Sequence, residues 1–229
     1  MWTTWVGAAL AIALWDWLAV ALDRRRMGYF TKPAVIVALL AAVLTGISRL
    51  GHPAMALSWA AVALLFSLVG DVLLMLPKER FVGGLVAFLL AHLAYLVAFS
   101  NGLPPFNLWT AGIAVAVGLL AGKFYERLRA ALVTQGKSFL IKPIAAYTAA
   151  ISLMVLAALL LPLRGHTPSA AALTVAAGAV LFLASDALLA WDRFVRPLPR
   201  TKVLRRSLYH LGQIAITVGL LLLSNVPLA

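Results

Sequence analysis

The chain contains no cysteine, and acidic residues number only seven among its 229 residues. Without cysteine it can form neither disulfide bonds nor thiolate metal sites, and it has no thiol nucleophile. It also lacks a Gly-x-Ser-x-Gly elbow and a His-Glu-x-x-His helix, the signatures of two common hydrolase classes. Charged residues make up 11% of the chain, which is too few to cover the surface of a soluble domain.

Hydrophobic residues make up 64% of the chain and gather in eight runs of near 20 residues, the length that an α-helix needs to cross a membrane. Segments rich in Pro and Gly separate several of these runs. No basic segment precedes the first run, so we interpret it as a retained helix rather than a cleaved signal. The predicted spans are residues 2–22, 33–50, 55–76, 81–100, 106–122, 140–162, 169–191 and 204–224.

The positive charges test this count of spans. Of the 19 Lys and Arg residues, 17 fall in alternate connections, and only Arg49 and Arg164 fall in the others. Under the positive-inside rule, the basic connections are cytoplasmic. We therefore predict an all-α, polytopic membrane protein of eight transmembrane helices in a single domain, residues 1–229, with both termini non-cytoplasmic. The net charge of +12 is explained by topology, and no nucleic-acid partner is expected.

The two halves of the chain, about residues 1–105 and 106–229, share an order of motifs. In each half a Lys-Pro pair opens one span, a small residue and Asp precede x-Leu-Leu in the next, and a His follows. The corresponding residues are Lys32 and Lys142, Asp71 and Asp186, and His92 and His210. A parallel duplication of a four-helix unit explains this order, and chance similarity between Leu- and Ala-rich segments is the alternative.

Two of the seven acidic residues are predicted to lie well inside the membrane. Asp71 and Asp186 are five or six residues from the cytoplasmic ends of their spans, or about 8 Å. A carboxylate there costs about 2.5–3.5 kcal/mol on insertion scales, so an intramembrane acid is a functional candidate by default. A structural hydrogen bond to another helix is the alternative. Asp16, in the first span, is either functional or paired.

Further polar side chains fall near the cytoplasmic ends of the same group of spans. They are Lys32, His92, Tyr95, Lys142, Tyr147, Ser185, Tyr209, His210 and Gln213. Together they predict a polar cavity open to the inner leaflet, with the two Lys residues at its rim to bind an anionic headgroup. Taken singly, each is explained as well by hydrogen bonding between helices, and the Lys residues by snorkelling to the interface.

A metal site made of Asp71, His92, Asp186 and His210 is a further alternative. His92 is predicted to lie deeper than the two aspartates, which counts against a shared ion. No metal and no cofactor are therefore expected.

Several segments resemble the YhhN-type lysoplasmalogenase family over nearly the whole chain. They are Lys32-Pro33, Gly70-Asp71-Val72-Leu73-Leu74, residues 81–95 up to His92 and Tyr95, residues 181–194 around Ser185-Asp186, and Tyr209-His210-Leu211-Gly212-Gln213. The resemblance implies an eight-helix membrane hydrolase that cleaves the vinyl ether bond of lysoplasmalogens. The substrate would be a lysophospholipid, and the products a fatty aldehyde and a glycerophospho-base. The family's intramembrane aspartates correspond to Asp71 and Asp186.

The chemistry of that reaction suits these residues. A vinyl ether resists base but is labile to acid: protonation of its β-carbon gives an oxocarbenium ion, water adds, and the hemiacetal collapses to an aldehyde and an alcohol. Two carboxyl groups in a low dielectric can supply a proton donor and an ionised partner. We therefore expect Asp71 and Asp186 to form a catalytic acid/base pair, with the other polar side chains orienting water or headgroup.

Two other functional classes remain open from sequence. A transporter or exporter would use the same acidic residues to move protons or solutes, and a lipid-binding regulator would show no turnover. The Ala-rich composition suggests a bacterial inner (plasma) membrane, with membrane lipid as surroundings, and either a monomer or a homodimer. Residues 123–137 are expected to form an amphipathic helix on the inner surface, with Phe124, Leu128, Leu132 and Val133 facing lipid.

Overall fold

The computed structural model describes residues 1–52, 54–76, 80–100, 102, 106–164 and 169–227, and these form eight long helices without strands. The helices are α1 (Trp2–Ala21), α2 (Arg25–Leu50), α3 (Met55–Met75), α4 (Phe81–Phe99), α5 (Leu108–Thr134), α6 (Ile141–Leu160), α7 (Ser169–Ala190) and α8 (Lys202–Leu223). Short elements η1 (Ser138–Leu140), η2 (Leu161–Leu163) and the π-helical turn η3 (Trp191–Val195) adjoin α6 and α7. All eight are apolar enough and long enough to cross a membrane, which confirms the predicted count.

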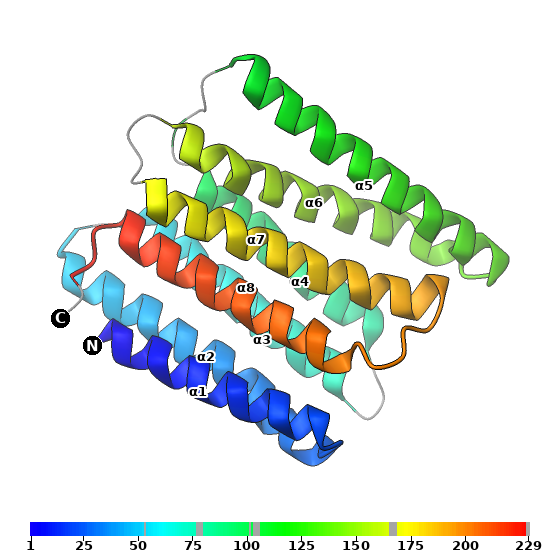
Figure 1. Ribbon diagram of the computed structural model, residues 1–229, viewed down its shortest axis with the longest axis horizontal. Coiled ribbons are helices and arrows are strands. Elements are labelled where there is room, and N and C mark those ends of the chain that lie inside the picture. The colour runs from blue at the N-terminus through cyan, green and yellow to red at the C-terminus, as the bar shows by residue number, and fades with distance from the viewer. Residues whose placement is uncertain (53, 77–79, 101, 103–105, 165–168, 228–229) are drawn as a thin grey trace.

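The helices run along one another as a bundle, with α5 at its edge (Figure 1). Sequence neighbours pair as α1 with α2, α3 with α4 and α7 with α8, while α8 also contacts α1, α2 and α3. Both termini lie at the same end, as an even number of spans requires, and Trp2 Nε1 donates a hydrogen bond to the Pro227 carbonyl (2.8 Å). The last residues of α1, α3, α5 and α7, next to the connections in which the basic residues gather, lie at the opposite end.

Two details of the sequence prediction are wrong. Pro33 lies inside α2, which begins at Arg25, instead of at the start of the helix; a membrane helix tolerates an internal proline better than a soluble one does. Residues 123–134 are the last part of α5 rather than a separate surface helix. Their apolar face packs on protein: Leu128 and Leu132 are buried in a cluster that includes Phe194, and of the four expected residues Val133 is the one that is exposed.

Glycines bring the backbones of α7 and α8 into close contact. A Cβ atom on Gly178 would lie 2.7 Å from the backbone nitrogen of Ile216, and one on Gly212 would lie 2.9 Å from the Gly178 carbonyl oxygen. Small residues at such positions allow the close approach that drives helix association in lipid. This contact fixes the position of α7, which carries Asp186, relative to α8, which carries Tyr209.

Replacing Gly212 with Val should therefore destabilise the bundle, because the branched side chain would meet backbone atoms that cannot move aside. We expect a loss of about 1–3 kcal/mol, the usual cost of overpacking, seen as a lower unfolding temperature in detergent. Gly118→Val is the matched control, since a Cβ atom on Gly118 in α5 meets nothing within 4 Å. Equal stability of the two variants would contradict the close α7–α8 contact.

Candidate active site

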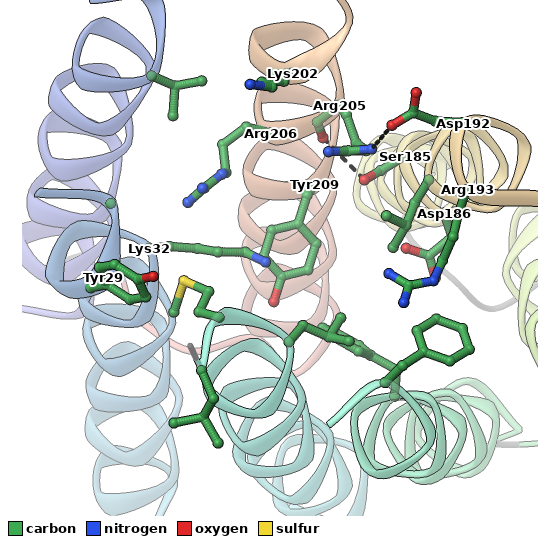
Figure 2. A pocket seen from close by; sticks show the side chains of 18 of the residues that line it. Tyr29, Lys32, Ser185, Asp186, Asp192, Arg193, Lys202, Arg205, Arg206 and Tyr209 are labelled. Carbon is green, nitrogen blue, oxygen red and sulfur yellow. Dashed lines mark hydrogen bonds and ion pairs between the residues drawn. The ribbon is translucent and has the colours of Figure 1, made fainter. Parts of the chain in front are cut away.

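A polar cavity of about 630 Å³ lies at the basic end of the bundle, away from the termini (Figure 2). It is bounded by the ends of α1, α3 and α4 and by α2, α7, η3 and α8. Three acidic side chains line it: Asp23, Asp186 and Asp192. Six cationic side chains line it as well: Arg24, Lys32, Arg193, Lys202, Arg205 and Arg206. The excess of positive charge suits an anionic ligand such as a phosphate.

A second, mostly apolar cavity of about 450 Å³ lies between α4, α5, α6 and α7. Its walls are built of Leu, Val, Ile, Ala and Phe side chains, with few polar groups. The two cavities share six lining residues, namely Leu74, Phe81, Phe88, Asp186, Leu189 and Arg193. Asp186 is the one carboxyl group among these six, so it stands where the polar cavity meets the apolar one.

Side chains from two other helices hold the Asp186 carboxyl group. The Tyr147 hydroxyl of α6 donates a hydrogen bond to Asp186 Oδ2, and His92 Nε2 of α4 lies 3.0 Å from that hydroxyl and 3.4 Å from Oδ2. Because Tyr147 has a single proton to donate, His92 Nε2 carries the proton of the His92–Tyr147 bond. His92 is fully buried, whereas 14% of the Asp186 side chain is exposed. Tyr147 and His92 thus orient the carboxyl group from the buried side, and its exposed part faces the two cavities.

Asp71 belongs to a separate group of side chains. Its carboxylate lies 2.7 Å from Lys32 Nζ of α2 and accepts a hydrogen bond from the Tyr209 hydroxyl of α8 (2.8 Å). Asp71 itself is fully buried and does not line either cavity, but Lys32 and Tyr209 both line the polar one. The two aspartates therefore have different partners, and of the two only Asp186 faces the cavities.

A second layer of hydrogen bonds lies deeper between α3, α4 and α8. The Tyr95 hydroxyl donates to Gln213 Oε1 (2.5 Å), and Gln213 Nε2 donates to Ser67 Oγ (3.0 Å). All three side chains are fully buried, and none lines a cavity. Tyr95 and Gln213 therefore form hydrogen bonds between helices and do not reach the cavities.

Asp16 is paired, which was one of its two predicted roles. It accepts a hydrogen bond from Thr31 of α2 and lies 3.3 Å from Arg206 Nη1 of α8, a residue that lines the polar cavity. His210 belongs to this group rather than to the Asp186 group: its Nδ1 accepts a hydrogen bond from Trp17 Nε1 (3.1 Å) and lies 3.9 Å from Asp16.

Of the remaining predicted residues, Ser185 lines the polar cavity and donates a hydrogen bond to the Arg205 carbonyl (3.0 Å). Lys142 is exposed on α6 and lines neither cavity, so the structure does not bring it to the site.

The sequence analysis did not predict five cationic residues of the cavity, because basic residues in the connections were explained by membrane topology. They are Arg24, Arg193, Lys202, Arg205 and Arg206. One signal was available for α8. Lys202, Arg205, Arg206 and Tyr209 recur at spacings of three and four residues, which places them on one helix face.

His92 was predicted to lie deeper than both aspartates, and this is wrong for Asp186. Asp71, four residues from the end of α3, does lie nearer the basic end than His92. Among the described residues, no group of three or more His, Asp and Glu side chains could hold a metal ion. The helix of α7 continues through η3 to Val195, so Asp186 lies nine residues from its end, at about 14 Å depth. His92 is eleven residues into α4, at about 16 Å. The two side chains are therefore at similar depth and in contact.

Comparison with known proteins gives relatives over most of the chain. The model of the YhhN family matches residues 27–220. The chain is 35% identical over 159 residues to "Lysoplasmalogenase TMEM86B" of Rattus norvegicus, covering 69% of this chain and 60% of that protein. It is 34% identical to the Homo sapiens protein of the same name, covering 69% and 62%. It is also 34% identical over 196 residues to "Lysoplasmalogenase" of Mycobacterium tuberculosis, covering 81% and 69%.

The matched region thus spans about three fifths of the length of the mammalian relatives. No solved structure matches the chain.

Proposed function

The chain belongs to the YhhN family, and from this membership and the two-cavity site we propose that it hydrolyses the vinyl ether bond of lysoplasmalogens. The products are a fatty aldehyde and a glycerophospho-base. Relatives from mammals and mycobacteria that carry the name lysoplasmalogenase support this activity.

The position of Asp186 is the observation that carries the proposal. A lysoplasmalogen is polar at one end and apolar at the other, and its vinyl ether bond lies at the junction. With the headgroup in the cationic cavity and the chain in the apolar cavity, that bond falls beside the carboxyl group that both cavities share. Close placement of the acid and the reacting bond is the main requirement of general acid catalysis.

In the proposed reaction, the Asp186 carboxyl group transfers its proton to the β-carbon of the vinyl ether. The α-carbon becomes an oxocarbenium ion, which the newly formed carboxylate stabilises by its charge. The same carboxylate takes a proton from a water molecule as the oxygen of that water bonds to the α-carbon. Asp186, which now carries that proton, donates it to the glycerol oxygen as the bond between this oxygen and the α-carbon breaks, and takes the proton of the hemiacetal hydroxyl. The alcohol and the aldehyde leave, and the carboxyl group is protonated again.

Tyr147 and His92 are proposed to orient the acid. The Tyr147 hydroxyl occupies Asp186 Oδ2, which leaves Oδ1 to carry and transfer the proton. His92 in turn keeps the Tyr147 hydroxyl pointed at the carboxyl group. Such supporting hydrogen bonds keep a catalytic group in its reactive geometry.

Asp71 is proposed to act through other residues rather than on the substrate itself. The expected acid/base pair is thus replaced by an acid, Asp186, and a positioning residue, Asp71. Its carboxylate holds the Lys32 ammonium and the Tyr209 hydroxyl, and both of these side chains line the polar cavity. Lys32 is then fixed in place for the headgroup phosphate.

Replacing Asp186 with Asn should abolish aldehyde release, because an amide cannot donate a proton to carbon. We expect a fall of about 10²–10⁴-fold in kcat, the range for loss of a general acid, measured by trapping the aldehyde from purified protein and lysoplasmalogen. Glu126→Gln makes the same chemical change at an exposed residue outside both cavities and should leave turnover unaltered. Asp71→Asn should chiefly raise KM for lysoplasmalogen, because Lys32 loses the carboxylate that fixes it in place for the headgroup phosphate.

Wild-type turnover by the Asp186→Asn protein would end this mechanism. Binding of lysoplasmalogen without any aldehyde from the wild-type protein would favour a lipid-binding regulator. Movement of an unchanged lipid across vesicles would favour a transporter.

We also propose that the polar cavity opens to the cytoplasm and that the termini lie outside, in a bacterial inner membrane. The distribution of 17 of 19 basic residues among the connections supports this orientation. The proposed duplication has support of its own: Asp71 is held from α2 and α8, and Asp186 from α6 and α4, which are the corresponding helices of the two halves.

The absence of cysteine makes the orientation testable by single substitutions. Ser138 and Ser100 are both exposed, the first between α5 and α6 at the basic end and the second after α4 at the end that holds the termini. A membrane-impermeant maleimide should label Ser100→Cys in spheroplasts and Ser138→Cys only after permeabilisation. The reverse pattern would invert the proposed topology.

A further inference from the structure

One face of α6 forms a continuous wall of the apolar cavity. The residues that line it recur every three or four positions, as one helix face requires: Ile144, Tyr147, Thr148, Ile151, Ser152, Val155 and Leu159. Tyr147, which contacts Asp186, lies one turn from the Ile144 end of this wall, and Leu159 lies at the other end. Twelve residues separate them, which corresponds to about 18 Å along the helix.

The opposite wall belongs to α5, which packs tightly at one end only. Leu128 and Leu132, near the end of α5, are buried against a cluster that includes Ile144 and Phe194. Nearer its start, Leu120 lines the cavity and is still 70% exposed. The first part of α5 is therefore largely uncovered by the other helices, in agreement with its position at the edge in Figure 1.

The length of this cavity corresponds to a hydrocarbon chain lying in one leaflet. The hydrocarbon core of a bilayer is about 30 Å thick, so one leaflet contributes about 15 Å. The α6 wall covers a similar distance, from Asp186 to Leu159, which is next to the last residue of α6 on the side of the termini. Since the cavity begins at the proposed reaction centre and is lined by apolar side chains, its occupant is identified by chemistry as the single chain of the substrate.

We propose that the α6 face from Tyr147 to Leu159 lies along the alkenyl chain and limits the length that the cavity can hold, and so sets the chain-length preference of the enzyme. This inference rests on the proposed function and adds the residues that determine specificity. Ser152 lies five residues beyond Tyr147, at about 8 Å, whereas Leu159 lies at about 18 Å. A bulky side chain at either position should shorten the cavity by a different, predictable amount.

The experiment compares Ser152→Trp and Leu159→Trp on lysoplasmalogens whose alkenyl chains have eight, twelve or eighteen carbons. Leu159→Trp should lower kcat/KM for the eighteen-carbon substrate by about tenfold or more, as expected when a pocket cannot hold its substrate, and should leave the eight-carbon substrate unaffected. Ser152→Trp should lower kcat/KM for the twelve-carbon and eighteen-carbon substrates alike.

Leu153→Trp is the matched control, because Leu153 is 50% exposed on the same helix and does not line the cavity. Its chain-length profile should equal that of the wild type. Leu120→Trp narrows the cavity from α5, where the side chain is largely exposed and folding is least at risk, and should also disfavour the longest chain. It provides the test if a variant of α6 fails to fold.

An unchanged ranking of chain lengths in every folded variant, with turnover intact, would overturn the chain-length proposal and leave the proposed function standing. Absence of turnover with all three substrates in the wild-type protein would instead overturn the proposed function.

Discussion

Buried carboxylates need partners in a low-dielectric interior, and that need organises this bundle. Removing one member of a buried ion pair costs about 3–5 kcal/mol because the other charge is left uncompensated. Asp16, Asp71 and Asp186 each find their partners on two other helices. Three carboxyl groups thus connect α1, α2 and α3 to α8, and α7 to α4 and α6.

The same pairings shape the site. Asp16 and Asp71 are fully buried, but the cations that they hold, Arg206 and Lys32, line the polar cavity. The buried acids therefore fix the positions of cavity cations without entering the cavity themselves. Asp186 differs from both, because its partners are a tyrosine and a histidine and its side chain remains partly exposed. This difference in partners is the reason why we propose Asp186 as the acid and Asp71 as a positioning residue.

The edge helix α5 packs against the bundle along only part of its length. Its later part packs on Phe194 and neighbouring side chains, whereas its earlier part leaves an apolar cavity open beside α6 and α7. In lipid, an apolar gap of this kind carries little cost, since hydrocarbon chains are as apolar as the side chains that line it. A soluble protein would close such a gap to exclude water. The membrane therefore allows a chain-sized cavity to persist next to a buried polar site.

Eight spans, their approximate limits and the candidacy of Asp71 and Asp186 followed from the sequence alone, because hydropathy and the cost of charge in lipid act on each segment separately. Only the tertiary structure decided which polar residues meet. His92 joined Asp186 through a helix that continues past its predicted end, His210 joined Asp16, and Lys142 stayed outside. Arg205 and Arg206 of α8, which the sequence analysis explained by topology alone, line the polar cavity. Contacts between helices depend on rotation, depth and packing partner, and none of these is encoded in the periodicity of a single span.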